Sequence, residues 1–130
     1  MTGEELIKQF ESGLTLADSF HHADHIRLAF EYLSHYSVFE ALQRFCEGLK
    51  GFAAAQGKAQ LYHETITWAY LLLIRERMAR AGRVQTWVEF AERNPDLFVW
   101  KGGVLSTLYW QQTLDSDLAR RTFLLPDRGL

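Results

Sequence analysis

Histidines are concentrated in two short stretches of the chain, FHHADH at residues 20–25 and YHET at residues 62–65. Four of the five histidines of the sequence lie in these stretches, and a glutamate follows one of them directly. Imidazole and carboxylate groups bind transition metals, and they also serve as general bases. The two stretches therefore hold the side chains whose chemistry depends most on where the fold places them.

The first stretch opens a segment with helical periodicity. At about 100° per residue, His22 and His25 fall among the apolar side chains of this helix, and His21 lies on its flank. The opposite side is expected to face water and carries Asp24, Arg27, Glu31, Ser34 and His35. Two imidazoles are thus predicted to point inward.

The second stretch begins the most hydrophobic run of the sequence. Glu76, Arg77 and Arg80 mark the wet side of a helix there, together with Thr65. His63, Glu64 and Thr67 lie on the far side, so that they too are expected to point inward. An ionised carboxylate in that position is costly unless it is paired or bound to a cation.

Two arrangements satisfy these inward groups. In the first, a divalent transition metal (zinc, iron, manganese or copper) binds between the two helices, with His25 or Glu64 as general base in an enzyme site. The predicted metal ligands are His21, His22, His25, His63 and Glu64. In the second, the same side chains and Thr67 hydrogen-bond to one another in a polar network within a helical core.

The motifs of known metal enzymes are incomplete here. His63-Glu64 begins like the zinc-peptidase pattern HExxH, but Thr67 occupies the position of the second histidine. No Glu-x-x-His pair occurs, which disfavours a ferritin-like di-iron site. Ser19 is interpreted as a helix N-cap, and Cys46, the only cysteine, as inert packing.

Aromatic residues are frequent in the second half of the chain. The residues concerned are Trp87, Phe90, Phe98, Trp100, Tyr109 and Trp110. Rings of this kind pack short helices onto a core, line ligand pockets or form partner surfaces. The sequence favours core packing and leaves open a pocket wall for a small molecule or a homodimer surface.

Composition sets the class of protein. The chain has 130 residues, a formal net charge of -2 and 48% hydrophobic residues, which suits one globular domain and no nucleic-acid partner. A single cysteine excludes an intrachain disulfide and favours a reducing compartment. The N-terminus does not have the pattern of a signal peptide, and the stretch from 66 to 74 is too short to cross a membrane. The expected location is the cytoplasm.

The elements that must position these residues are all predicted to be helical. With only two prolines and no sustained alternation of apolar residues, the fold expected is a compact all-α bundle of three long helices with shorter helices packed around them. Capping patterns begin at Thr2, Ser37 and Thr86, Gly57 and Gly82 are placed as C-caps, and a loosely held tail starts at about 125. The predicted helices span 3–12, 18–35, 38–56, 60–81, 86–93, 103–111 and 115–123.

The functional expectation that follows is a small cytoplasmic metal-binding protein, acting as a metal-dependent enzyme on a small organic substrate. The alternative is a non-catalytic helical binding or protein-interaction module whose buried histidines form a structural hydrogen-bond network. A haem or other cofactor held by one histidine is a third reading.

Overall fold

A computed structural model describes residues 1–15, 18 and 20–129, and this part of the chain is helical without a strand. The all-α class predicted from the sequence is confirmed. The elements are α1 (Gly3–Glu11), α2 (His22–His35), α3 (Val38–Ala55), η2 (Ala59–Leu61), α4 (Glu64–Arg80), α5 (Trp87–Arg93), η3 (Pro95–Phe98), η4 (Val104–Thr107), α6 (Gln111–Leu114) and α7 (Asp117–Arg121), where η marks a 3-10 turn.

The local signals for helix ends are confirmed where side-chain chemistry dictates them. The hydroxyls of Thr2, Ser37 and Thr86 each accept the backbone N–H three residues later, which satisfies a free donor of the first turn. Gly57 and Gly82 have φ of 69° and 72° and follow the ends of α3 and α4, as a left-handed helix stop requires.

Several expected boundaries were wrong. The helix predicted from 60 begins at Glu64, because Tyr62 and His63 are extended and a separate 3-10 turn precedes them. The helix predicted over 103–111 is only a 3-10 turn, and the one over 115–123 is limited to the single turn of α7. The N-cap predicted at Ser19 lies outside the described residues.

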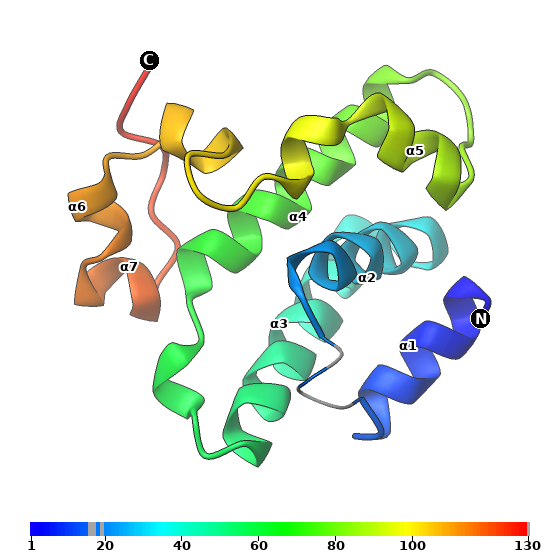
Figure 1. Cartoon of the computed structure of the whole chain (residues 1–130), viewed down its shortest axis with the longest axis horizontal. Coiled ribbons are helices and arrows are strands. Elements are labelled where there is room, and N and C mark those ends of the chain that lie inside the picture. The colour runs from blue at the N-terminus through cyan, green and yellow to red at the C-terminus, as the bar shows by residue number, and fades with distance from the viewer. Residues whose placement is uncertain (16–17, 19, 130) are drawn as a thin grey trace.

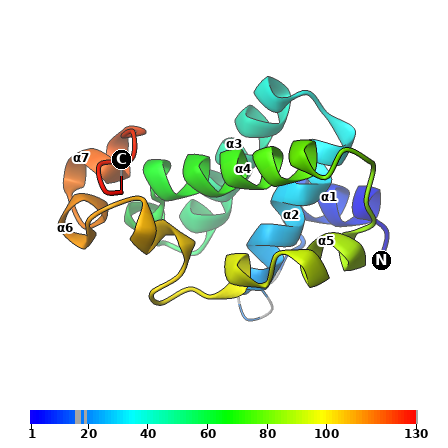
Figure 2. The same ribbon diagram turned by 90° about the horizontal axis from the view of Figure 1, so that it is seen from above.

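Helix α2 lies at the centre of the molecule (Figure 1). It contacts α1, α3, α4 and α5, while α7 packs on α4. In the views of Figures 1 and 2, α6 and α7 lie at one end of the long axis, and α1 and α5 lie at the other. The described ends of the chain are therefore far apart.

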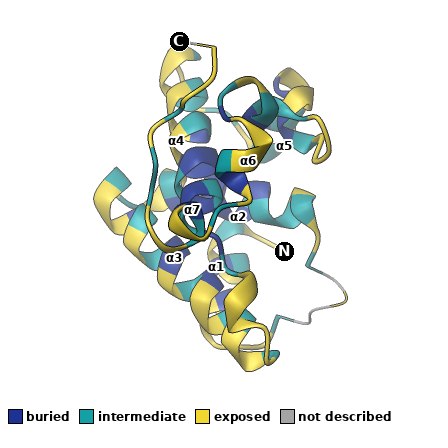
Figure 3. Cartoon of the chain, turned by 90° about the vertical axis from the view of Figure 1, so that its left-hand side faces the viewer, coloured by how far each residue is buried: buried dark blue, intermediate teal, exposed yellow. Residues whose placement is uncertain are grey.

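Burial follows this arrangement, with the buried residues gathered where the long helices meet (Figure 3). On α2, Ile26, Ala29 and Tyr32 are almost fully buried. Glu31, which was expected to face water, is only 7% exposed, and this expectation was wrong. Helix α1 covers it, since a Cβ on Gly3 would stand 2.1 Å from its Oε1, and Arg27 pairs with its carboxylate at 3.5 Å.

The segment after α7 runs back along the start of α4. The Thr65 hydroxyl donates to Thr122 O at 2.8 Å and accepts from Leu124 N at 3.1 Å. Thr65 is therefore fully buried. The prediction that it faces water was wrong, because a helical wheel describes one helix only and does not include the segment after α7, which covers Thr65. Asp127, in the tail expected to be loose, accepts from Trp110 N, and Arg128 donates to Ser106 O.

Two glycines of α3 make the close packing of α1 testable. A Cβ at Gly48 would lie 2.3 Å from the Phe10 ring, whereas a Cβ at Gly51 would meet nothing within 4 Å. We expect Gly48→Ala to lower the free energy of unfolding by about 1–3 kcal/mol through overpacking. Gly51→Ala, the matched control in the same helix, should raise it by roughly 0.5–1 kcal/mol. Urea unfolding of both variants measures the difference, and equal effects would contradict the close approach.

Candidate functional site

A cavity of about 440 Å³ lies where α2, α3 and α4 meet. Its walls combine aliphatic and aromatic side chains with a small number of polar groups, which is the usual character of a site for a small molecule. Trp100, from the loop between η3 and η4, and Arg120 of α7 also line it. The lining residues are His22, His25, Ile26, Phe45, Leu49, Phe52, Ala53, Gln56, Lys58, Leu61, Tyr62, His63, Ile66, Thr67, Tyr70, Trp100 and Arg120.

His22 lines one wall of this cavity from the first turn of α2. Its Nε2–H donates to Leu97 O at 2.8 Å, which ties the helix to η3. Its ring lies 5.1 Å from that of Tyr70 and 5.0 Å from that of Trp100. Burial lowers the pKa of His22, and the hydrogen bond to the carbonyl opposes this only in part, so the ring is neutral at pH 7.

His25 lies one turn further along α2 and also lines the cavity. The ring of Phe20 lies 4.3 Å from its imidazole, and Phe20 in turn packs on Phe52 at 5.0 Å. Burial, with a smaller contribution from His22, lowers the pKa of His25 to about 4 despite the nearby carboxylate of Asp24. His25 is therefore a neutral group in an aromatic setting.

His63 is the N-cap of α4 and is held by both ring nitrogens. Nδ1 accepts the backbone N–H of Ile66 at 3.1 Å, which leaves the proton of the neutral ring on Nε2. That Nε2–H donates to Leu114 O at 2.6 Å. Both nitrogens are thus engaged with backbone, and neither presents a lone pair to the cavity.

Glu64, expected to share the site, is directed elsewhere. Its Oε1 accepts the hydroxyl hydrogen bond of Tyr62 at 2.6 Å, and its Oε2 lies 4.0 Å from Lys50 Nζ. It does not line the cavity. These partners reduce the free-energy cost of a partly buried carboxylate, because the hydroxyl donates a hydrogen bond to it and the ammonium carries the opposite charge.

The first histidine of FHHADH is also separate. His21 is exposed, and its backbone N–H donates to Asp24 Oδ2 at 2.8 Å, so Asp24 serves the start of the helix. The structure thus brings His22, His25 and His63 to one cavity and leaves His21 and Glu64 outside it. Within residues 1–15, 18 and 20–129, no three His, Cys, Asp or Glu side chains are grouped closely enough to hold a metal ion.

A general base works best when its pKa is near the working pH, and a pKa of about 4 makes His25 a weak base at pH 7. The Thr67 hydroxyl, which could otherwise act as a nucleophile, donates to His63 O at 2.8 Å. What the cavity offers is an apolar volume with neutral imidazoles on its walls.

Several lining residues were not singled out from the sequence. Lys58 and Arg120 are ordinary charged residues in their local contexts, and only the packing of α7 on α4 brings Arg120 to the cavity. Phe45, Leu49 and Phe52 are spaced by three and four residues on α3, which is the pattern of any core helix. No local signal distinguishes a wall of a cavity from a filled core.

The aromatic residues at 87–110 have three different settings. Trp87 packs on Phe30, Phe90 and Phe98, and Phe90 also packs on Phe30, as the core interpretation predicted. Trp100 is a wall of the cavity. Trp110 is half exposed, and the guanidinium of Arg128 lies 4.3 Å above its ring.

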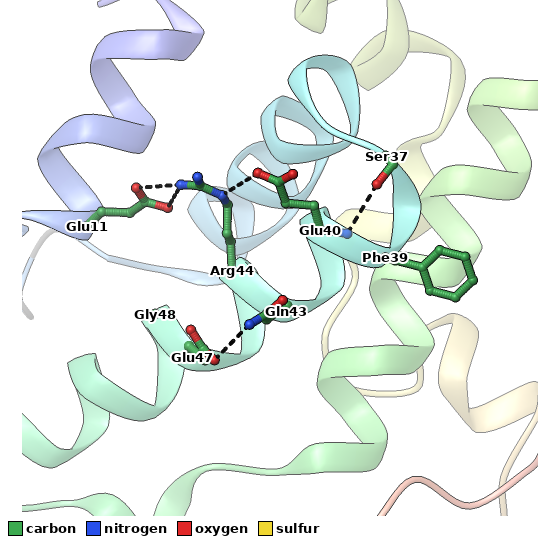
Figure 4. A pocket seen from close by; sticks show the side chains of 8 residues that line it. All are labelled: Glu11, Ser37, Phe39, Glu40, Gln43, Arg44, Glu47 and Gly48. Atoms are coloured by element: carbon green, nitrogen blue, oxygen red, sulfur yellow. Dashed lines mark hydrogen bonds and ion pairs between the residues drawn. The ribbon is translucent and has the colours of Figure 1, made fainter.

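A wider surface hollow of about 750 Å³ lies between α1 and the first half of α3. Figure 4 shows that its polar side chains are directed at one another. Arg44 binds Glu11 at 3.1 Å and Glu40 at 3.0 Å, and Gln43 donates to Glu47 at 3.3 Å. Most of its residues are exposed. We therefore interpret it as a surface ion-pair network that joins α1 to α3.

Comparison with known proteins adds no relative. No family model, no curated protein and no solved structure matches the chain. In the described part of the chain, none of the helices has the length and apolar character needed to cross a bilayer.

The depressed pKa of His25 has a consequence for stability. Because the folded-state pKa of about 4 lies below the ordinary 6.5, the unfolded chain takes up the proton first as the pH falls. The free energy of unfolding is therefore highest above pH 6.5. As the pH falls towards 4, the titration of His25 lowers it by on the order of 3 kcal/mol. Burial lowers the pKa values of His22 and His63 too, so they act in the same direction.

We expect His25→Gln to reduce the loss of unfolding free energy between pH 6.5 and pH 5 by about 2 kcal/mol, since Gln takes up no proton. Urea unfolding at a series of pH values measures this slope. His21→Gln, which alters an exposed imidazole at the start of the same helix, is the matched control. An unchanged slope in His25→Gln would contradict the burial of this imidazole in its neutral form.

Proposed function

We propose that this chain is a helical binding protein for a small, largely apolar organic molecule, which occupies the cavity between α2, α3 and α4. The observation that carries the proposal is the cavity of about 440 Å³ with its mostly aromatic and aliphatic lining. Its volume lies within the roughly 300–1,000 Å³ range of small-molecule sites. The neutral state of His22 and His25 supports the proposal, because neither ring adds a charge that an apolar ligand would have to desolvate.

This proposal corresponds to the non-catalytic alternative that the sequence left open. We favour it over the metal-dependent enzyme because His63 uses both nitrogens on backbone groups and Glu64 is paired with Tyr62. In addition, none of the described side-chain nitrogen and oxygen atoms is both fully buried and without a hydrogen-bond partner. A metal is therefore not needed to explain the burial of these groups.

Binding can be tested with N-phenyl-1-naphthylamine, a neutral dye that fluoresces in apolar surroundings. We expect a saturable fluorescence increase with a stoichiometry of one dye per chain. Ala53→Phe places a ring in the cavity from α3 and should abolish most of the signal. Ala54→Phe, its exposed neighbour outside the cavity, should leave the titration as in the native protein. Equal titrations for the two variants would overturn the proposal.

The metal hypothesis has its own test in elemental analysis of the protein as isolated. If the cavity binds an organic ligand only, zinc, iron, manganese and copper should be far below one atom per chain. Adding each ion should leave the midpoint of thermal unfolding unchanged, because a ligand that binds only the folded state raises it. If the protein carries nearly one metal ion per chain, and the double variant His25→Ala, His63→Ala loses it, the metal hypothesis would be supported instead.

A further inference from the structure

The charged residues of the cavity all have one sign. Lys58 and Arg120 line it, and no aspartate or glutamate does. No ion pair joins either of them to another residue in the part of the chain that the structure describes. Burial lowers the pKa of His63, the charge of Arg120 lowers it further, and the hydrogen bond to Leu114 and the carboxylate of Asp115 oppose this. The cavity thus combines apolar walls with two basic side chains, of which Lys58 is exposed and Arg120 is half-buried.

Lys58 and Arg120 belong to two separate segments of the chain, and both segments lie near the start of α4. Lys58 directly precedes η2, which leads into the start of α4, and Arg120 belongs to α7, which packs on α4. Figure 1 shows η2 and α7 both near the beginning of α4, away from the α2 end. Lys58 and Arg120 thus line the cavity from segments near the start of α4, and the rings of Phe45 and Phe52 line it from α3.

A second cavity, of about 500 Å³, adjoins the first. The two share His63, Ile66, Tyr70, Trp100 and Arg120. The second adds polar groups, among them Lys101, Ser106 and Gln111, and its one acidic residue is Asp115. The Oδ1 of Asp115 accepts from Gln111 Nε2 at 2.8 Å. Arg120 thus lies where an apolar space meets a polar one.

We propose that the ligand is an organic carboxylate with a hydrocarbon chain, whose chain fills the apolar cavity and whose carboxylate binds Arg120 with help from Lys58. This inference rests on the proposed function and specifies its ligand class. A guanidinium matches a carboxylate with two parallel N–H donors, and the pairing is strong where water is partly excluded. A cationic ligand would meet repulsion from both side chains, and a neutral one would leave their charge unused.

Three probes with the same chain and different head groups test this at pH 7.5, namely decanoate, decan-1-ol and decylammonium. Each competes with N-phenyl-1-naphthylamine below its aggregation concentration. We expect decanoate to bind about tenfold more tightly than decanol, as one charge-assisted hydrogen-bonded pair supplies. Decylammonium should bind more weakly than the alcohol. Equal affinities of decanoate and decanol would overturn the inference and leave the proposed function intact, whereas no binding of dye or probe would overturn both.

Substitutions of Arg120 and Lys58 test where the carboxylate of decanoate binds. Arg120→Gln should reduce the preference for decanoate over decanol to about twofold or less, since one charge-assisted pair is lost. Arg120→Lys, which keeps the charge, should retain part of the preference, and Lys58→Gln should lower it by a smaller factor. Arg121→Gln removes the exposed neighbouring charge, paired with Asp117 at 3.4 Å, and serves as the control. A preference that survives Arg120→Gln, in a variant with native thermal stability, would overturn the assignment.

Discussion

The fold depends on the burial of helix α2 from nearly every side. Ile26, Leu28 and Ala29 are each at most 1% exposed, although they point in different directions around the helix. A helix that is buried around most of its circumference must be covered by several neighbours, and α1, α3, α4 and α5 supply that cover. The cover is incomplete at the first turn, where His22 and His25 line the cavity. The candidate site is thus a gap in the packing around the central helix.

His63 connects that gap to the rest of the chain. One ring nitrogen caps α4 and the other donates to Leu114 O, so a single side chain fixes both the start of α4 and the position of α6. Because α7 follows α6 directly, this contact also helps to place Arg120 at the cavity. His63, which the sequence presented as a metal ligand, has both ring nitrogens bonded to backbone groups and connects α4 to α6.

The sequence predicted what depends on neighbouring residues and failed where distant segments meet. Caps at Thr2, Ser37 and Thr86 and the stops at Gly57 and Gly82 are local, and all were found. Glu31 and Thr65 were predicted to face water because each lies outside the apolar face of its own helix. In the structure, α1 covers Glu31 and the segment after α7 covers Thr65. The inward direction of His22, His25 and His63 followed from periodicity. The hydrogen bonds of His22 and His63 to backbone carbonyls, and the position of Arg120 at the cavity, depend on contacts across 50 residues or more, which no pattern encodes.

Residues 122–124, the segment after α7 that bonds to Thr65, form a strap across the start of α4 and affect how the molecule can open. Its bonds to Thr65 close loops of 57 and 59 residues, and the bond of His63 to Leu114 closes one of 51. Contacts of such long separation are formed late in folding, since the entropy of closing the loop has to be overcome first. A partial opening that releases α6, α7 and the strap would leave the burial of α2 by α1, α3 and α5 intact, and it would cost less than global unfolding. That opening would move Arg120, the residue that α7 contributes to the cavity, away from the other lining residues while the rest of the protein stays folded.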